Sequence, residues 1–336
     1  LYFGASEDVE LDGQPDDDAG ETGGGDDGNG DDEDGVSMLD ANGNPTMLIT
    51  CLETTMRINT VIPVGQTAYL QGWIDFNDDG DWADAGEQVA KDIALTSANG
   101  TYYLTFKVPC DAKVTPRTFL RFRLSTTPGL SYAGFAMDGE VEDYVEVLKG
   151  LDYGDLPTKP GTALFPTTLA DNGPHHVYDP TAPALTLGSN LDTDLDGTPS
   201  AFADGDDVAD GMDDEDGITY LTPLIPGQQA CIEIDAVNAT GQPATLYAYL
   251  DYDGDCVLAP LFNIPVPAGG LNNYRYCFTV PTDNSTSGAM AFFRFRLGTN
   301  ANEVNVPTGL AMNGEVEDYK ASLYKVGNLV WEDRNN

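Results

Sequence analysis

Apolar and polar side chains alternate along short runs of this chain, the pattern of a β-strand with one buried face. The alternation is plain at residues 54–61, 101–108, 119–124 and 274–280. Glycine (37 residues) and proline (21 residues) interrupt these runs, so the strands are predicted to be short and joined by turns. No window has the apolar period and the length of an ordinary helix.

The pattern therefore predicts an all-β protein. Short strands separated by Gly, Pro, Asn and Asp favour tandem antiparallel β-sandwich modules of the jelly-roll or immunoglobulin-like kind. The acidic segments between the strands then become long loops outside the sandwich, and we interpret them as calcium-binding loops.

The chain repeats itself once. Arg-Phe-Arg-Leu at residues 121–124 and Gly-Glu-Val-Glu-Asp-Tyr at 139–144 recur at 294–297 and 314–319. Segments 31–35 and 73–78 have counterparts at 213–217 and 249–253. We predict a first module at 1–150, a second at 151–325, and the start of a different domain at 326–336.

The first module has no counterpart of residues 151–187, which open the second. A sandwich without these residues exposes backbone groups along a strand edge. We expect the native chain, or neighbouring chains of a fibre, to supply them, and residues 151–324 to fold independently.

The charge of the chain narrows its partners. Asp and Glu total 56 against 15 Lys and Arg, a formal net charge of −41. Such a charge repels nucleic acid and anionic membranes and attracts divalent cations. No run approaches the ~20 apolar residues needed to cross a bilayer. We therefore expect calcium as a partner, no nucleic acid, and no membrane span in these residues.

The cysteines do not have the spacing of a metal site, so disulfides formed in an oxidising compartment are favoured. Cys51 and Cys110, the pair in the first module, are predicted to be joined. In the second module the pairing among Cys231, Cys256 and Cys277 is open, although Cys231 and Cys277 both lie on the polar phase of alternating strands. Buried thiols are the alternative.

Carboxylates at alternate positions followed by glycine can converge on one calcium ion, because the glycine allows a sharp turn. This spacing occurs once in each module, and further acidic residues follow it. The candidate ligands are Asp192, Asp194, Asp196, Asp204 and Asp206 in the second module, and Asp8, Glu10 and Asp12 in the first. For residues 16–30, which contain three consecutive glycines, a solvated acidic linker is the competing interpretation.

A second acidic loop follows a predicted strand in each module. Its candidate ligands in the first module are Asp75, Asn77, Asp79, Asp81, Asp84 and Glu87. The closing Glu comes one position later than in an EF-hand and no helices flank the loop, so we predict a calcium ion held in a strand-to-strand turn. The second module keeps Asp251, Asp253 and Asp255 but has Cys256 in place of the glycine, and we expect this site to be weak or lost.

The repeated Arg and Glu segments are predicted to pair as antiparallel strands. Arg121 and Arg123 are expected to point outward and to face Glu140 and Glu142 as ion pairs, with the same arrangement in the second module. The alternative is that Asp138, Glu140 and Asp143 close a calcium site.

Enzymatic chemistry has little support in the sequence. No nucleophile elbow, zinc-protease or phosphate-binding motif is present. His175 and His176 are adjacent, and neighbouring side chains of a strand point to opposite faces, so we assign them a packing or surface role. We expect a protein that is not an enzyme.

The ordered motifs resemble a known family. Asp-Tyr-Gly-Asp, Asp-Glu-Asp-Gly, Trp-Ile-Asp-Phe-Asn, Arg-Phe-Arg-Leu and Gly-Glu-Val-Glu-Asp-Tyr are similar to the GEVED domain of large secreted bacterial surface proteins. Residues 326–333 resemble the start of an SdrD B-like domain, the calcium-binding stalk repeat of bacterial adhesins. The resemblance implies a multidomain protein, secreted or on the bacterial cell surface, with a stalk or adhesive role.

Two functions follow. The first is a structural or adhesive array stiffened by calcium, whose partners are neighbouring domains of the same polypeptide or neighbouring chains of an extracellular fibre. The second is a carbohydrate-binding module that recognises surface glycans by stacking them on Trp82, Tyr132 and Tyr178.

Overall fold

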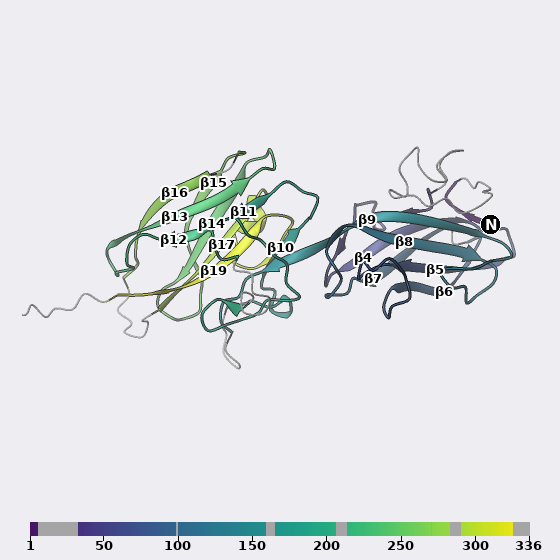
Figure 1. Ribbon diagram of the computed structural model, residues 1–336, viewed down its shortest axis with the longest axis horizontal. Helices are drawn as coiled ribbons and strands as arrows, with labels where there is room; N and C mark the ends of the chain where they lie inside the picture. Colours follow the sequence, from purple (N-terminus) through teal and green to yellow (C-terminus); the bar gives the residue numbers. More distant parts are fainter. Residues whose placement is uncertain are drawn as a thin grey trace, which may run out of the picture. The chain divides into compact units, whose positions relative to one another are not determined.

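The protein is described by a computed structural model over residues 1–5, 33–98, 100–158, 165–205, 214–269, 271–282 and 290–324. The chain divides into two compact units (Figure 1). Unit 1 is Leu1–Gly150 with Asp179–Thr181, and unit 2 is Leu151–Tyr178 with Ala182–Asn336. Nearly every regular element is a strand, and the sheets are mainly antiparallel, which confirms the predicted all-β class. Among the described residues, no helix has the length and apolar character needed to cross a membrane.

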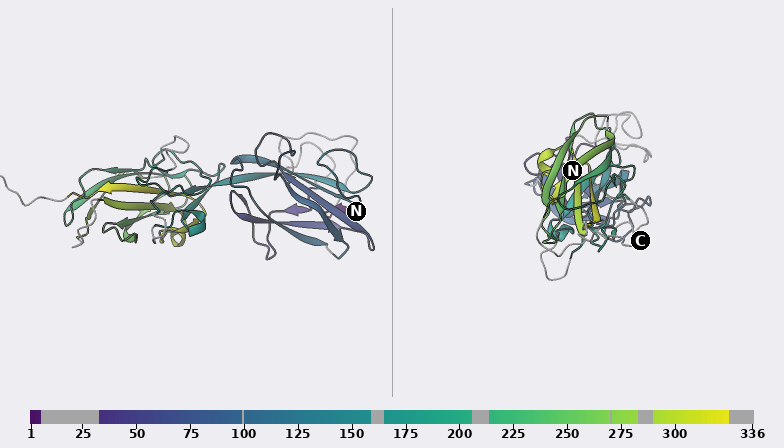
Figure 2. Two further views of the ribbon diagram at one scale, coloured as in Figure 1. Left: turned by 90° about the horizontal axis from the view of Figure 1, so that it is seen from below. Right: turned by 90° about the vertical axis from the view of Figure 1, so that its left-hand side faces the viewer.

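Unit 1 is built from two sheets, whose strands Figure 2 shows from two further directions. The first sheet contains β1 (Tyr2–Phe3), β4 (Glu53–Val61), β2 (Val36–Ser37) and β7 (Thr101–Lys107). The second contains β9 (Glu140–Tyr153), β8 (Thr115–Ser125), β5 (Thr67–Ile74), β6 (Gln88–Thr96) and, parallel to β9, β3 (Leu48–Ile49).

Unit 2 follows the same plan. One sheet contains β11 (Leu185–Leu187), β13 (Gln229–Asn238), β12 (Ile218–Tyr220) and β16 (Leu271–Thr279). The other contains β15 (Ala259–Val266), β14 (Ala244–Asp251), β17 (Met290–Gly298) and β19 (Glu315–Ser322). β10 (Pro174–Tyr178) pairs in parallel with β18 (Gly309–Ala311), and the described residues of unit 2 also contain the short helical turns η2 (Leu169–Asp171) and α2 (Ala301–Val304).

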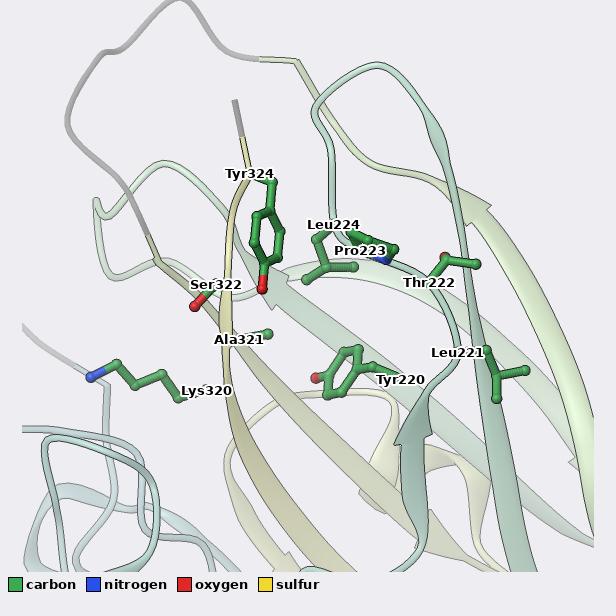
Figure 3. Close-up of a pocket in the computed structure, with 9 residues that line it drawn as sticks. All are labelled: Tyr220, Leu221, Thr222, Pro223, Leu224, Lys320, Ala321, Ser322 and Tyr324. Atoms are coloured by element: carbon green, nitrogen blue, oxygen red, sulfur yellow. The ribbon is translucent and has the colours of Figure 1, made fainter. Parts of the chain in front are cut away.

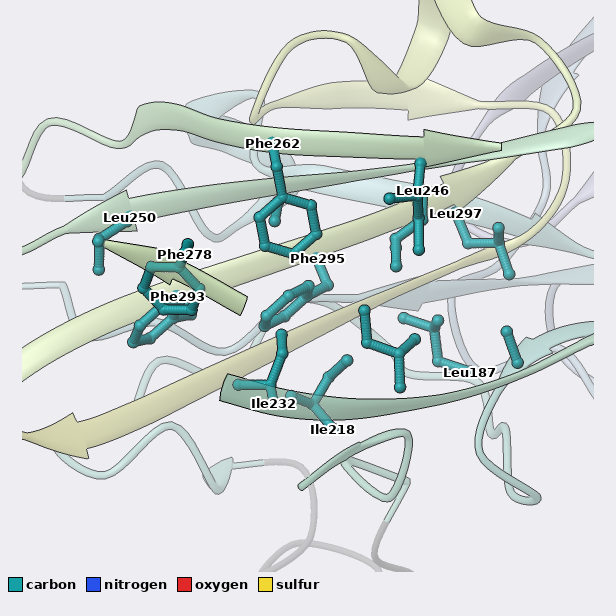
Figure 4. Close-up of a cluster of buried hydrophobic side chains, with 14 of the residues drawn as sticks. Leu187, Ile218, Ile232, Leu246, Leu250, Phe262, Phe278, Phe293, Phe295 and Leu297 are labelled. Carbon is teal, nitrogen blue, oxygen red and sulfur yellow. The ribbon is translucent and has the colours of Figure 1, made fainter. Parts of the chain in front are cut away.

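The core of unit 2 lies between its two sheets (Figure 4). Ile232 and Ile234 of β13 are buried at alternate positions, and Phe293 and Phe295 of β17 pack in the same cluster. Each buried side chain of this size stabilises the fold by about 1.5–3 kcal/mol relative to an exposed one. The alternate residues that the sequence pattern predicts to be buried are therefore the ones that form the core.

A disulfide holds each unit. Cys51 is bonded to Cys110 in unit 1, which confirms the predicted bridge. In unit 2, Cys231 of β13 lies directly opposite Cys277 of β16, and these two residues form the second disulfide. Cys256 takes part in neither.

The predicted Arg–Glu ion pairs are wrong. β8 and β9 do pair antiparallel, but Arg121 lies opposite Asp143, and Glu142 lies opposite Phe122. Directly opposite residues share a face of the sheet, so the glutamates lie on the face of Phe122, away from the arginines. Val141, which occupies the arginine face, is 45% exposed, whereas Glu142 is 1% exposed. Side chains of a strand alternate between the two faces of the sheet, so a register that differs by one residue from the expected one places every side chain on the opposite face.

The first arginine of each repeat pairs with the aspartate of the Gly-Glu-Val-Glu-Asp-Tyr motif. In unit 2, Arg294 Nε donates to Asp318 Oδ1 at 2.7 Å and Nη2 donates to Oδ2 at 2.6 Å, and both side chains are completely buried. In unit 1 the same bidentate pair joins Arg121 and Asp143, but the Asp143 side chain is 37% exposed.

The second arginine of each repeat holds the loop that follows its strand. Arg296 donates to the carbonyl oxygens of Glu303, Val306, Thr308 and Gly309. Arg123 donates to the carbonyl oxygens of Ser131, Ala133 and Gly134. A buried guanidinium can satisfy several carbonyl groups at once because it carries five N–H donors in a fixed plane.

The two arginine–aspartate pairs should differ in their contribution to stability. Asp318→Asn leaves the buried Arg294 charge unbalanced and should lower the free energy of unfolding of unit 2 by about 3–5 kcal/mol. The matched change Asp143→Asn should lower that of unit 1 by about 1 kcal/mol or less, because solvent screens the partly exposed pair. Urea unfolding of the full chain measures both. Equal, small losses in the two variants would contradict this assignment.

Candidate metal centres

The loop between β5 and β6 is organised by Asp75, which is buried at the end of β5. Asp75 Oδ1 accepts hydrogen bonds from the N–H groups of Asp78 (2.6 Å) and Asp79 (3.3 Å), and Oδ2 accepts one from Gly80 (3.0 Å). Asp78 and Gly80 have left-handed φ angles of 56° and 89°, so the chain folds tightly around the Asp75 carboxylate. The glycine predicted for this turn occupies the position with the larger positive φ.

Glu87 closes the base of the same loop. It is buried, and its two oxygens accept from the N–H groups of Phe76 (3.2 Å) and Asp84 (3.1 Å). Burial raises the pKa of the Glu87 carboxyl, and the nearby carboxylates of Asp75 and Asp84 raise it further. The loop therefore accumulates negative charge that a cation would offset.

The remaining predicted ligands gather at the exposed side of this loop. Asp79, Asp81 and Asp84 each offer a carboxylate oxygen within 4.8 Å of the others. Asn77 donates to Asp84 Oδ2 at 2.8 Å. Calcium binds oxygen ligands at about 2.3–2.6 Å, so oxygens this close can share one ion, and an all-oxygen set suits a hard cation. Asp78, by contrast, is paired with Lys113 Nζ at 2.6 Å.

The corresponding loop of unit 2 has the same turn but fewer candidate oxygen ligands. Asp251 Oδ1 accepts from the N–H groups of Asp253 (3.1 Å) and Gly254 (2.8 Å), and Oδ2 accepts from Cys256 (3.0 Å). Cys256 has a φ of 66°, so it adopts the left-handed conformation that Gly80 has in unit 1. Asp251, Asp253 and Asp255 bring oxygens within 4.8 Å of one another. Burial and the neighbouring carboxylates raise the pKa of Asp253. That this site is weaker than its counterpart stays a prediction.

The loop that contains Asp192, Asp194 and Asp196 lies against the start of unit 2. Asp194 Oδ2 accepts from Tyr153 N–H at 3.2 Å, and its own N–H donates to the Leu151 carbonyl at 2.9 Å. Asp196 Oδ1 accepts from the N–H groups of Leu169 (2.6 Å) and Gly197 (2.9 Å). The two carboxylates thus bind different backbone segments, and a shared ion among these residues stays a prediction.

Other predicted ligands have separate surroundings. Asp204 Oδ1 accepts from the Ser200 hydroxyl at 2.5 Å in a turn of its own. Asp8, Glu10, Asp12 and Asp206 lie outside the described residues. The alternative calcium site of Asp138, Glu140 and Asp143 does not form as expected, because Asp138 accepts from Ser125 and Thr126 while Asp143 pairs with Arg121.

The glutamates of the repeated motif lie between the sheets, where the alternation of the sequence did not place them. Glu142 Oε1 accepts from Gly35 N–H at 3.1 Å and Oε2 accepts from the Tyr144 hydroxyl at 2.9 Å. Glu140 accepts from Phe3 N–H. These bonds tie β9 to segments of the opposite sheet of unit 1. The recurrence of Asp-Glu-Asp-Gly together with Gly-Glu-Val-Glu-Asp-Tyr was the available signal, since the two segments meet here.

Trp82 and Tyr132, two of the aromatic residues expected to stack on a sugar, contact other residues of unit 1 instead. Trp82 and Tyr132 have ring centroids 6.0 Å apart, and the Arg121 guanidinium lies 4.6 Å from the centre of the Trp82 ring. The Trp82 indole N–H donates to the Phe119 carbonyl at 3.1 Å. Tyr178 belongs to unit 2.

A cavity of about 350 Å³ lies beside β12 and β19 of unit 2 (Figure 3). It is lined by Tyr220, Leu221, Thr222, Pro223, Leu224, Lys320, Ala321, Ser322 and Tyr324. The ammonium group of Lys320 donates to the Ala201 carbonyl at 2.6 Å and lies 4.3 Å from the centre of the Phe202 ring. The cavity is therefore lined mainly by apolar and hydroxyl groups, and none of the predicted metal ligands is in it.

The adjacent histidines have packing roles. His176 is buried, its Nδ1 is bonded to the Asn313 carbonyl at 3.1 Å, and its Nε2 accepts from Arg296 Nε at 3.0 Å. Burial and the Arg296 charge hold its pKa well below the usual range. His175 Nδ1 is bonded to the Gly173 carbonyl at 2.9 Å, and its ring stacks on Tyr153.

Comparisons with known proteins give one family. The GEVED domain matches residues 69–145 and 245–322, so one match lies in each unit. No curated protein matches the chain.

Three solved structures are similar at low identity. CBD12 from CALX1.2 is 6% identical over 82% of this chain and 95% of its own, with a TM-score of 0.21. The calcium binding domain CBD12 of CALX1.1 is 8% identical over 82% of this chain and 96% of its own, with a TM-score of 0.22. An Escherichia coli alpha-2-macroglobulin activated by porcine elastase is 12% identical over 84% of this chain and 34% of its own, with a TM-score of 0.20. TM-scores this low do not indicate a common arrangement of strands.

The buried Glu142 predicts how the stability of unit 1 depends on pH. Burial, with a contribution from Glu140, raises the pKa of Glu142 from 4.5 to about 9. The folded state therefore holds a proton that the unfolded chain releases near pH 4.5. The stabilisation is complete below that pH and is lost as the pH rises towards about 9.

Glu142→Gln has the shape of a protonated glutamate but cannot lose a proton. The free energy of unfolding of this variant should therefore change less between pH 4.5 and about 9. Urea unfolding in chelator, followed by the fluorescence of Trp73 and Trp82 in unit 1, measures both chains. Glu53→Gln, a change at an exposed glutamate of β4, is the control and should keep the wild-type slope. A wild-type profile as flat as that of the variant would be inconsistent with a buried neutral acid.

Proposed function

We propose that this chain is a non-enzymatic, calcium-stabilised structural or adhesive repeat region of a large bacterial cell-surface or secreted protein. The observation that carries the proposal is the loop of unit 1, where Asp79, Asp81 and Asp84 converge above a turn organised by buried Asp75 and Glu87. This arrangement provides carboxylate and amide oxygens at a spacing that one calcium ion can bridge.

The overall charge supports a role for cations. The net charge of the chain is −41. The carboxylates of a folded unit therefore repel one another, and this repulsion destabilises a compact state. Calcium bound between carboxylates lowers this repulsion and adds binding energy that only the folded state gains. Stabilisation by calcium also suits an extracellular location, where the ion is abundant.

The two disulfides support an oxidising, extracellular location. Repetition of one sandwich plan supports a role as a spacer or stalk, because tandem modules lengthen a protein without changing its fold. Partners in this proposal are neighbouring domains of the same polypeptide or neighbouring chains of a fibre. The SdrD B-like start at 326–336 lies outside the described residues and remains a prediction.

Carbohydrate recognition is the alternative, and the structure gives it less support. Arg121 lies over the Trp82 ring, so a sugar would have to displace this cation in order to stack there. Glycan-array binding by the full chain in calcium distinguishes the two functions. Saturable binding that Trp82→Ala abolishes would favour the alternative.

Removal of calcium should lower the melting temperature of the full chain. For extracellular modules with a Kd of about 10⁻⁴ to 10⁻³ M, millimolar calcium adds about 0.4–1.4 kcal/mol per site through mass action. Scanning calorimetry in about 1 mM calcium and in excess chelator measures the shift. Identical melts in the two conditions would refute calcium stabilisation.

The loop of unit 1 should account for part of this shift. Asp79→Asn with Asp81→Asn removes two candidate ligands and should reduce the calcium-induced increase in the melting temperature of unit 1. Asp111→Asn, at an exposed aspartate outside the loop, is the control for the change in charge and should retain the full increase. Asp253→Asn with Asp255→Asn should have a smaller effect, because the loop of unit 2 has fewer candidate oxygen ligands. A full calcium response in the Asp79/Asp81 variant would contradict binding at this loop.

A further inference from the structure

The repeated motif has almost the same sequence in the two units but different surroundings. Residues 134–144 of unit 1 correspond to residues 309–319 of unit 2. In unit 2 the motif valine, Val316, is 1% exposed, whereas its counterpart Val141 in unit 1 is 45% exposed. Unit 2 therefore covers a surface that is open in unit 1.

In unit 2 this surface is covered by residues 151–178, which we name the opening segment. Asp152 Oδ2 of this segment accepts the N–H group of Val316 at 2.9 Å. Asp318 Oδ2 in turn accepts the N–H group of Leu156 at 2.9 Å. The opening segment thus binds β19 through a backbone N–H group and a carboxylate, and β9 of unit 1 has both groups at the corresponding positions.

The opening segment also adds a strand beside the loop that precedes β19. His175 of β10 lies opposite Leu310 in the parallel pairing of β10 with β18. Unit 1 has the same loop, but within its described part no strand pairs with residues 134–136. Phe135, the counterpart of Leu310, is 86% exposed. An extended segment can bind such an edge through its backbone.

One buried donor of unit 1 lacks the acceptor that its counterpart has in unit 2. Arg296 Nε donates to His176 Nε2 of β10 at 3.0 Å. Arg123, the counterpart of Arg296, is only 4% exposed, and its Nε has no hydrogen-bond partner among the residues that the structure describes. Few buried donors remain unpaired in native proteins, because the lost hydration is not replaced. Arg123 therefore marks a position where an acceptor from another segment fits.

These features lie on one face of unit 1. Arg123 lies directly opposite Val141, and Arg121 lies directly opposite Asp143, so all four side chains share a face of the sheet. The loop at 134–137 is tied to this face because the Arg123 guanidinium donates to the carbonyl oxygen of its first residue. We name Arg123, Val141, Asp143 and residues 134–137 the docking edge.

The docking edge specifies the chemistry of its partner. In unit 2 the groups that correspond to Val141 N–H, the Asp143 carboxylate and Arg123 Nε bind a carboxylate, backbone N–H groups and a histidine of the opening segment. The Asp-Tyr-Gly-Asp and Pro-His-His-Val sequences supply these groups. Residues 1–336 contain each of these sequences once, in unit 2. A partner with the same groups therefore comes from outside these residues.

We propose that the docking edge of unit 1 binds an extended segment of a neighbouring polypeptide chain that carries the Asp-Tyr-Gly-Asp and Pro-His-His-Val sequences. This inference deepens the proposed function, because it names the surface and the segment through which a neighbouring chain binds. Binding of the segment needs no calcium ion. A failure of peptide binding and a failure of the calcium-induced shift in melting temperature are therefore distinguishable.

The probe is a synthetic, fluorescently labelled peptide of residues 151–178, added to the full chain. The opening segment of unit 2 is covalently attached, so its high effective concentration keeps the added peptide out of unit 2. Fluorescence anisotropy of the peptide should rise and saturate as the full chain is added.

Val141→Lys should weaken this binding at least about tenfold, because the lysine side chain would project from the docking edge into the space of the peptide. The valine is already partly exposed, so unit 1 should keep its fold. Val64→Lys, at an exposed valine in the turn between β4 and β5, is the matched control and should bind the peptide as the unchanged chain does. Circular dichroism checks that both variants are folded.

Two peptide variants test the role of Arg123. His176→Ala in the peptide removes the acceptor for Arg123 Nε and should weaken binding by about tenfold or more, as expected for a hydrogen bond to a charged group. Thr158→Ala changes a residue that is exposed in unit 2 and should leave binding unchanged.

Absence of saturable binding to the full chain would overturn the proposal, and so would equal binding by Val141→Lys and Val64→Lys. Equal binding by the His176→Ala and Thr158→Ala peptides would overturn the assignment of the histidine to Arg123. Sedimentation of the full chain without peptide tests another occupant. A dimer that dissociates in Val141→Lys would identify a second copy of this chain as the partner and overturn the proposed segment.

Discussion

Each unit depends on two glutamates between its sheets, of which Glu142, Glu315 and Glu317 are buried and Glu140 is half-buried. Glu140 and Glu142 in unit 1, and Glu315 and Glu317 in unit 2, accept backbone N–H groups from the opposite sheet or its flanking segments. A buried carboxylate that lost these donors would carry a large desolvation cost, so the bonds specify one register and one position of the sheets. An apolar contact of similar area would tolerate sliding.

Glycine makes this close approach possible. A Cβ atom on Gly217 would lie 2.5 Å from Leu187 Cβ and 2.9 Å from Glu317 Oε2. In unit 1 a Cβ atom on Gly35 would lie 2.3 Å from Phe3 Cβ and 2.9 Å from Glu142 Oε2. Contacts this short force a displacement of the glutamate or of the strand. The recurrence of Asp-Glu-Asp-Gly with the glutamate motif therefore has a steric reason in both units.

Sequence reasoning recovered the features that depend on local pattern. Alternation predicted the strands, and repetition predicted two similar units of the all-β class. The Cys51–Cys110 bridge followed from the pair's isolation within one module, whereas Cys231–Cys277 needed the register of β13 and β16. The turn at Asp75 followed from its ligand spacing, and the structure supplied the reason: Asp75 is buried and caps the loop.

The glutamates could not be placed correctly from pattern alone. In unit 1 the polarity of the Gly-Glu-Val-Glu-Asp-Tyr strand is inverted, with Val141 outside and Glu142 inside, whereas in unit 2 both Val316 and Glu317 are buried. A prediction from alternation assumes that the apolar residues of a strand face the core. It is wrong where hydrogen bonds from other segments hold a charged residue in the core instead. Arg296 is similar, because its hydrogen bonds go to a loop that the sequence pattern did not connect to it.

The central claim is that calcium ions balance carboxylates which the fold holds together. The most direct measurement is a crystal structure of the chain in millimolar calcium, with anomalous scattering recorded to identify the ions. The account predicts an anomalous peak at the loop of Asp79, Asp81 and Asp84. Well-ordered density at this loop without an anomalous peak would contradict it.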